Sequence, residues 1–213
     1  MKARDDWGRT PVSGPLDADW RRAADALRAG GAVVLPTDTV YGVGALPSVP
    51  GATAALFALK DRDRTRPLAV LVADDEQAMA LIEPQTEPVL RLIDRFWPGP
   101  LTLVLRRSAS AAGYDLGADS STIGVRCPDH DRVRALAAEV GPTATTSANR
   151  HGEPTPPTAR EAAAALSGAV EVVLDGGRLD GQASTVVDCT GVVPVVLRAG
   201  ALPPEAVTTE LAR

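Results

Sequence analysis

The chain of 213 residues contains only two cysteines, Cys127 and Cys189, which lie far apart and form no CxxC pair. Its two histidines, His130 and His151, are too few for a histidine-rich metal site. We therefore predict two buried or half-buried thiols in a reducing compartment, with neither a disulfide nor a bound metal.

Long apolar runs are also missing. No stretch approaches the roughly 20 apolar residues that a membrane span requires. The N-terminus lacks the apolar region of a signal peptide, since it reads MKARDDWGRTPVSG. We expect a cytoplasmic protein with no membrane association.

Aromatic residues make up 3% of the chain, so the core must consist mainly of Val, Leu, Ile and Ala. The net charge of −5 argues against a protein whose main function is to bind nucleic-acid phosphates. A local basic cluster nevertheless occurs, formed by Lys60, Arg62, Arg64 and Arg66.

The common nucleotide and hydrolase fingerprints are absent. The sequence contains no Walker GxxxxGK[ST], no HExxH and no GxSxG. Gly42 and Gly44 begin a GxGxxG spacing, but Pro47 stands where the third glycine is expected. We therefore predict no dinucleotide loop of the Rossmann type.

Helical and strand-like patterns alternate along the chain. Periodicity and punctuation by Gly and Pro predict helices over residues 16–28, 52–60, 75–82, 86–96, 131–140 and 158–166, with a weak helix after Pro204. Strands are predicted over residues 32–35, 68–72, 101–105, 122–126, 170–174, 185–188 and 193–197. No repeat or linker divides the chain. We predict a loose arm over residues 1–15 and one α/β (α+β) domain over residues 16–213, with helices flanking a twisted mixed sheet.

Three polar segments lie where predicted strands or helices end. Residues 36–42 offer hydroxyls and a carboxylate to a small polar ligand, or form a turn that caps a following helix. The cations of residues 60–66 suit an anion such as a triphosphate, or form a solvated surface. Residues 145–152 could present backbone N–H groups to phosphate, or form an ordinary turn.

Single polar residues near other strand ends form a fourth, scattered group. This group contains Thr122, Arg126, Ser184 and Arg198. An isolated arginine at a strand end most often forms a surface ion pair, so none of these residues indicates a function by itself.

The order of these segments resembles the YrdC-like family of threonylcarbamoyl-AMP synthases. Five motifs of that family occur in order over roughly residues 20–202: PTDTVYG at 36–42, KDR with PL at 60–68, VRCP at 125–128, SAN with a glycine at 147–152, and LRAG at 197–200. The resemblance implies a YrdC-like fold with a concave basic cavity. It also implies the synthesis of threonylcarbamoyl-AMP and pyrophosphate from L-threonine, bicarbonate and ATP, for the modification of tRNA.

The resemblance also implies roles for individual residues. The residues expected around ATP are Lys60, Arg62, Arg66, Thr122, Ser147, Asn149, Thr155 and Arg198. Those expected around threonine are Thr39, Arg126, Thr145 and Ser184. Lys60 and Arg62 are the candidate catalytic residues, Mg²⁺ is expected to bind through the phosphates, and no nucleophilic side chain is needed for such chemistry.

The implied partners are the threonylcarbamoyl-transferase proteins of the tRNA-modification pathway. Two alternatives stay open, because function depends on the site rather than on the fold. One is a non-catalytic RNA-binding module, which the basic cluster favours and the net charge opposes. The other is a carbamoyl-adenylate enzyme with a different amine acceptor.

Overall fold

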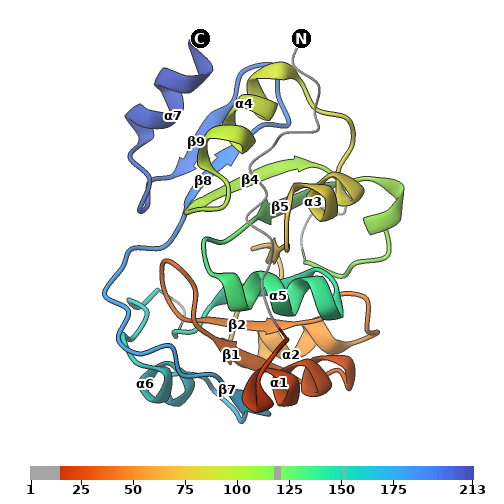
Figure 1. Ribbon diagram of the computed structural model, residues 1–213, viewed down its shortest axis with the longest axis vertical. Coiled ribbons are helices and arrows are strands. Elements are labelled where there is room, and N and C mark those ends of the chain that lie inside the picture. Colours follow the sequence, from red (N-terminus) through yellow and green to blue (C-terminus); the bar gives the residue numbers. More distant parts are fainter. Residues whose placement is uncertain (1–14, 118–120, 151) are drawn as a thin grey trace.

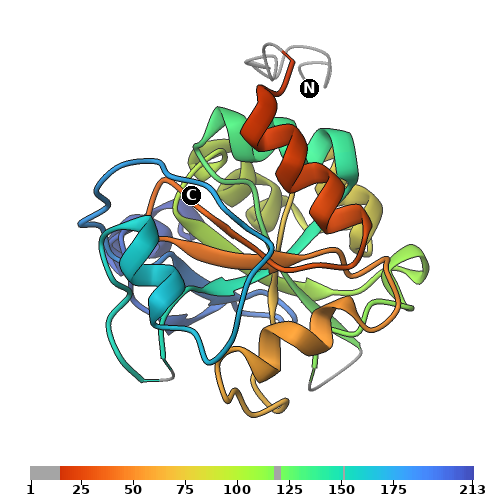
Figure 2. The ribbon, with the colours of Figure 1, turned by 90° about the horizontal axis from the view of Figure 1, so that it is seen from below.

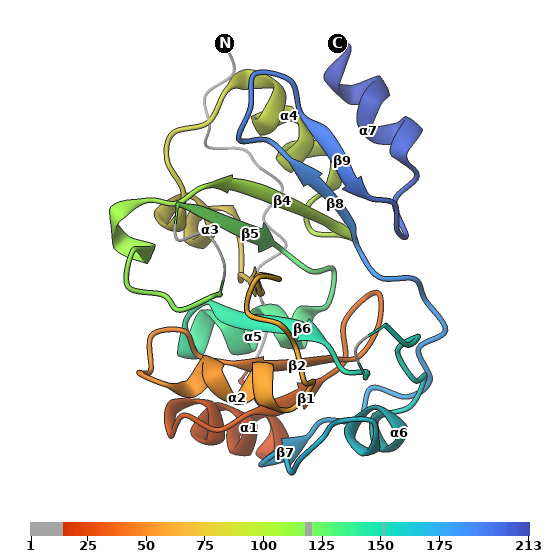
Figure 3. The same ribbon diagram turned by 180° about the vertical axis from the view of Figure 1, so that it is seen from behind.

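The computed structural model describes residues 15–117, 121–150 and 152–213, which fold around one mixed β-sheet (Figure 1 and Figure 3). The order of the strands within the described residues is β7-β1-β2-β6-β3-β5-β4-β8-β9. The pairs β1–β7, β3–β5 and β4–β8 are parallel, and the others are antiparallel. The prediction of a mixed sheet flanked by helices is therefore confirmed.

The strands are short and most are apolar. They are β1 (Val33–Leu35), β2 (Gly42–Ala45), β3 (Ala69–Leu71), β4 (Leu101–Arg106), β5 (Thr122–Arg126), β6 (Thr143–Ser147), β7 (Val172–Val173), β8 (Thr185–Asp188) and β9 (Val195–Arg198). The helices are α1 (Ala18–Arg28), α2 (Ala52–Ala58), α3 (Asp75–Leu81), α4 (Glu87–Phe96), α5 (Asp131–Val140), α6 (Ala159–Ala164) and α7 (Pro204–Leu211).

Side chains cap several of these helices. Asp17 accepts a hydrogen bond from the Trp20 N–H at 3.2 Å at the start of α1. Thr158 accepts one from the Glu161 N–H at 3.4 Å at the start of α6, and its hydroxyl donates to the Glu161 carboxylate at 2.6 Å. Each cap satisfies an N–H group that the first turn of a helix leaves without an intrahelical partner.

Helices cover both faces of the β1–β2 end of the sheet (Figure 2). On one face, Leu27 of α1 and Leu136 of α5 belong to the same buried cluster as Val33. On the other face, Val34 is buried with Leu56 of α2. Adjacent strand residues point to opposite faces, and burying each large aliphatic side chain contributes about 1.5–3 kcal/mol.

Of the two alternatives for residues 36–42, a turn that caps a following helix is wrong. The chain turns back and enters the strand β2, which was not predicted. Within the turn, the Thr37 hydroxyl accepts hydrogen bonds from the N–H groups of Thr39 and Val40. The predicted strand over residues 170–174 is also shorter, since only Val172 and Val173 pair with β1.

The two thiols are free, as predicted, with Cys127 buried and Cys189 half-buried. None of the helices formed by the described residues has the length and hydrophobicity that crossing a bilayer requires. The predicted arm, residues 1–15, lies outside the described part of the chain except for its last residue.

Candidate active site

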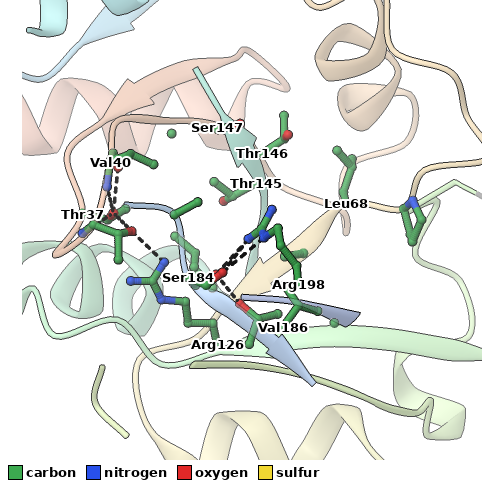
Figure 4. A pocket seen from close by; sticks show the side chains of 18 of the residues that line it. Thr37, Val40, Leu68, Arg126, Thr145, Thr146, Ser147, Ser184, Val186 and Arg198 are labelled. Atoms are coloured by element: carbon green, nitrogen blue, oxygen red, sulfur yellow. Dashed lines mark hydrogen bonds between the residues drawn. The ribbon is translucent and has the colours of Figure 1, made fainter. Parts of the chain in front are cut away.

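A cavity of about 280 Å³ lies against the sheet (Figure 4). The strands that contribute to its wall are β2, β3, β4, β5, β6, β8 and β9. Small residues form its floor. Ala69 pairs with Gly124 on one side and with Thr145 on the other, so the three lie in one row across the sheet. Because large side chains are missing from this row, the sheet is hollowed there.

Glycines of β2 make room for the threonines of β6. A Cβ atom on Gly42 would lie 2.9 Å from Thr145 Cγ2, and one on Gly44 would lie 2.9 Å from Thr143 Cγ2. Glycine within a strand often marks a close approach of this kind. The Thr145 side chain can therefore line the cavity.

Arg126 is held at one end of the cavity by three acceptors. Its Nη2 forms an ion pair with Asp38 Oδ1 at 2.6 Å, and its Nη1 donates to Thr39 Oγ1 at 3.0 Å. Its Nε donates to the Gly99 carbonyl at 3.0 Å. A guanidinium has five N–H groups. The described residues therefore leave two N–H groups of Arg126 for a ligand.

Arg126 stays protonated in this environment. Burial lowers the pKa of Arg126, and the Asp38 carboxylate acts in the opposite direction. Because a free guanidinium titrates above pH 12, the group stays protonated under ordinary conditions. The fixed fork suits a carboxylate ligand.

Arg198 and Ser184 form a second polar group, close to the first (Figure 4). Arg198 Nη2 donates to the Ser184 carbonyl at 2.8 Å, and the Ser184 hydroxyl contacts the Thr102 hydroxyl at 2.8 Å. Burial lowers the pKa of Arg62 and of Arg198. The nearby charge of Arg198 further lowers the pKa of Arg62, and that of Arg126 further lowers the pKa of Arg198. Three arginines therefore line one cavity, and no Asp or Glu is among the described residues that line it.

Arg62 is the residue of the basic cluster that lines the cavity. Its Nε donates to the Arg66 carbonyl and its Nη2 to the Pro67 carbonyl, both at 3.0 Å. Arg64 instead pairs with Asp115 at 2.6 Å on the exposed surface. The cluster thus divides, and one guanidinium fork is fixed at the cavity.

Lys60 lies behind the cavity wall and is only 3% exposed. Its ammonium group donates to Asn149 Oδ1 at 2.6 Å, to the Ser147 carbonyl, and to Ser147 Oγ at 3.3 Å. Burial, together with the charge of Arg62, lowers the pKa of Lys60 to about 8. These acceptors carry no formal charge, so the buried cation adds a positive potential beside the loop that follows β6.

The structure brings together most of the residues selected from the sequence. Those that line the cavity are Thr39, Arg62, Thr122, Arg126, Thr145, Ser147, Ser184 and Arg198. Lys60 and Asn149 contact Ser147 from behind, whereas Arg66 and Thr155 are not among the lining residues.

No individual role is predicted from the sequence for Asp38 or Thr102. Asp38 stood within a segment noted for its carboxylate, so a signal for it existed. Thr102 had none, because it lies within the apolar run of β4.

An arrangement of this kind can bind a ligand with more than one anionic group. Fixed arginine forks and hydroxyls can orient such a ligand and stabilise charge that develops on it. The two thiols are poor nucleophiles, because burial raises the pKa of Cys127 and of Cys189 to about 12. The geometry thus favours positioning and charge neutralisation over covalent catalysis.

Comparison with known proteins shows a family model and several relatives to which this chain is similar. The family model Sua5_yciO_yrdC, described as "Telomere recombination", matches residues 25–200. A Mycobacterium tuberculosis protein is 42% identical over 190 residues, which are 89% of this chain and 87% of that protein. The threonylcarbamoyl-AMP synthase of Bacillus subtilis is 38% identical over 191 residues, which are 89% of this chain and 55% of that protein.

A solved structure extends the comparison to three dimensions. The crystal structure of Pyrococcus abyssi Sua5 complexed with L-threonine is similar to this chain, with a TM-score of 0.80 and 37% sequence identity. The match covers 90% of this chain and 56% of that one. The chain thus spans about half the length of the Bacillus and Pyrococcus proteins.

Proposed function

Because the chain belongs to the Sua5/YciO/YrdC family, we propose that it is a threonylcarbamoyl-AMP synthase. The observation that carries the proposal is the cavity with three arginines, in which a fixed guanidinium retains two donors for a carboxylate. A relative with the same fold is known in complex with L-threonine, whose carboxylate matches those donors in charge and geometry.

The reaction uses L-threonine, bicarbonate and ATP. The threonine amine adds to the carbon of bicarbonate or CO₂ and forms a carbamate, with loss of water or a proton. A carbamate oxygen then attacks the α-phosphorus of ATP, and the bond to the β-phosphate oxygen breaks. The products are threonylcarbamoyl-AMP and pyrophosphate.

The residues of the cavity divide between the two substrates. Arg126 receives the threonine carboxylate, and the hydroxyls that complete this part are those of Thr39, Thr145 and Ser184. The groups around the nucleotide are Arg62, Arg198, Thr122 and Ser147, with Lys60 and Asn149 supporting them. Arg66 and Thr155 would contact only a part of the nucleotide that extends beyond the cavity.

Mg²⁺ enters with ATP, as part of the substrate. The described residues that line the cavity include no carboxylate, and Mg²⁺ prefers oxygen ligands such as carboxylate, phosphate and water. The phosphates and water would then supply its ligands. The arginines neutralise the remaining charge as pyrophosphate leaves.

The same proposal includes the context of the reaction. The enzyme acts in the cytoplasm as one domain over residues 16–213, and threonylcarbamoyl-transferase proteins use its product to modify tRNA. A non-catalytic RNA-binding role has less support, because Lys60 is buried and Arg64 is neutralised by Asp115. The cations that favoured this role are thus only partly available to RNA.

The test is to incubate the protein with MgATP, bicarbonate and L-threonine and to measure pyrophosphate and the adenylate. We expect both products only when all three substrates are present. If the folded protein releases no pyrophosphate in response to threonine, the proposal is wrong. Release with another amine instead of threonine would identify a different acceptor.

A further inference from the structure

Residues 175–183, which we call the strap, lie between β7 and β8 and cross from one end of the sheet to the other (Figure 3). Most of these residues are exposed. An exposed segment with few buried side chains adopts a single conformation only where specific contacts fix it. The strap has such contacts, and they meet the turn at residues 36–41.

The hydroxyl of Tyr41 holds the first part of the strap. It donates to the Gly177 carbonyl at 2.6 Å and accepts from the Gly176 N–H at 3.0 Å. Tyr41 is fully buried, so its ring fixes the position of the hydroxyl. Farther along, the Leu179 N–H donates to the Pro157 carbonyl at 2.8 Å.

Two glycines bring the strap into close contact with the turn. A Cβ atom on Gly176 would lie 2.5 Å from Pro36 Cβ, and one on Gly181 would lie 2.3 Å from the carbonyl oxygen of Thr39. Contacts of a real Cβ atom under 3.0 Å are essentially never found. An alanine at residue 181 would thus push the two backbones apart by at least about 0.7 Å, the difference between these distances.

We propose that Gly181 is a positioning residue for the amino-acid end of the cavity. Thr39 is 3% exposed, and its hydroxyl lies 3.0 Å from Arg126 Nη1 and 2.9 Å from the Thr37 hydroxyl. Gly181 of the strap packs closely against the carbonyl group of Thr39. The close approach at Gly181 therefore sets where the Thr39 hydroxyl lies relative to the guanidinium that receives the substrate carboxylate.

This inference rests on the proposed function, and it assigns a role to a residue outside the cavity lining. A misplacement of about 1 Å caused by a change away from the reacting atoms can cost up to about 100-fold in rate. The effect should be selective for one substrate. Gly181 contacts the turn at Thr39, whereas the groups proposed to bind the nucleotide lie on other segments.

The test compares Gly181→Ala with Gly113→Ala, whose new Cβ atom would meet nothing within 4 Å. Pyrophosphate release is measured with either threonine or ATP varied. We expect Gly181→Ala to raise the KM for threonine about tenfold or more and to change the KM for ATP less than about twofold. Gly113→Ala should leave both values unchanged.

Tyr41→Phe provides a second variant in case Gly181→Ala does not fold. It removes the hydroxyl that holds the strap and keeps the buried ring, so we expect a threefold or larger rise in the KM for threonine, with the KM for ATP unchanged. An unchanged KM for threonine in the folded variants, or an equal rise for both substrates, would overturn the inference. If the wild-type protein itself shows no release that depends on threonine, the proposed function fails instead.

Discussion

Replacing Asp38 by Asn tests the ion pair at the amino-acid end of the cavity. The change removes one negative charge and keeps the size of the side chain. Asp38 Oδ1 lies 2.6 Å from Arg126 Nη2, and the two side chains are 13% and 7% exposed. The guanidinium would then be buried without its counter-ion, although the Gly99 carbonyl and the Thr39 hydroxyl would remain as acceptors.

The expected loss of stability follows from these contacts. Removing one partner of a buried ion pair typically costs about 3–5 kcal/mol, and the two remaining acceptors favour the lower value, about 3 kcal/mol. In a domain of 150–250 residues, each kcal/mol lowers the melting temperature by about 2–4 °C. We therefore expect Asp38→Asn to lower the Tm by about 6–12 °C.

The control is Asp180→Asn, which makes the same chemical change in an exposed pair. Asp180 Oδ2 lies 2.8 Å from Arg178 Nε, but both side chains are 64% exposed. An exposed ion pair contributes about 0–1 kcal/mol, so the Tm should fall by no more than about 4 °C. Thermal unfolding followed by circular dichroism gives both values. If Asp38→Asn lowered the Tm by no more than about 4 °C, as its control does, a stabilising buried ion pair at this position would be ruled out.

Three further predictions concern the cations and the thiols. Arg62→Ala should lower kcat/KM for ATP at least about tenfold, which is the effect of losing about 1.4 kcal/mol. Arg64→Ala breaks only an exposed ion pair, so its kcat/KM for ATP should stay within about twofold of the wild-type value. Because the pKa of Lys60 is lowered to about 8, its charge is present below pH 8 and is lost above it, so kcat/KM for ATP should fall as the pH rises through 8. A Lys60→Arg variant that retained the same decline would contradict the assignment. Since burial raises the pKa of Cys127 and of Cys189 to about 12, a thiol reagent should react slowly with the native protein at pH 8 and rapidly after unfolding; rapid labelling of the native protein would show that the thiols are accessible.

Apolar periodicity and the positions of Gly and Pro made much of the fold predictable. The residues of β1 and β3 are almost wholly apolar because helices or other segments cover them. The strand β2 was missed for a physical reason. Its residues Gly42, Gly44 and Ala45 have a low intrinsic preference for strands, and hydrogen bonds to β1 and β6 hold the segment in the sheet. Tertiary structure thus determines this strand.

The candidate site was predictable from the order of its motifs more than from any single residue. Sequence alone could not give the direction of a long side chain. Lys60 and Arg62 are two positions apart. The Lys60 ammonium group nevertheless donates to Asn149 in the loop after β6, whereas Arg62 lines the cavity. Thr102 was missed because an apolar strand gives no sign that one of its faces is open to a ligand.

A structure with L-threonine and a non-hydrolysable ATP analogue would show whether both substrates share this cavity. We expect the threonine carboxylate within hydrogen-bonding distance of Arg126 and the phosphates beside Arg62 and Arg198. Either ligand bound elsewhere on the protein, with this cavity empty, would contradict this expectation.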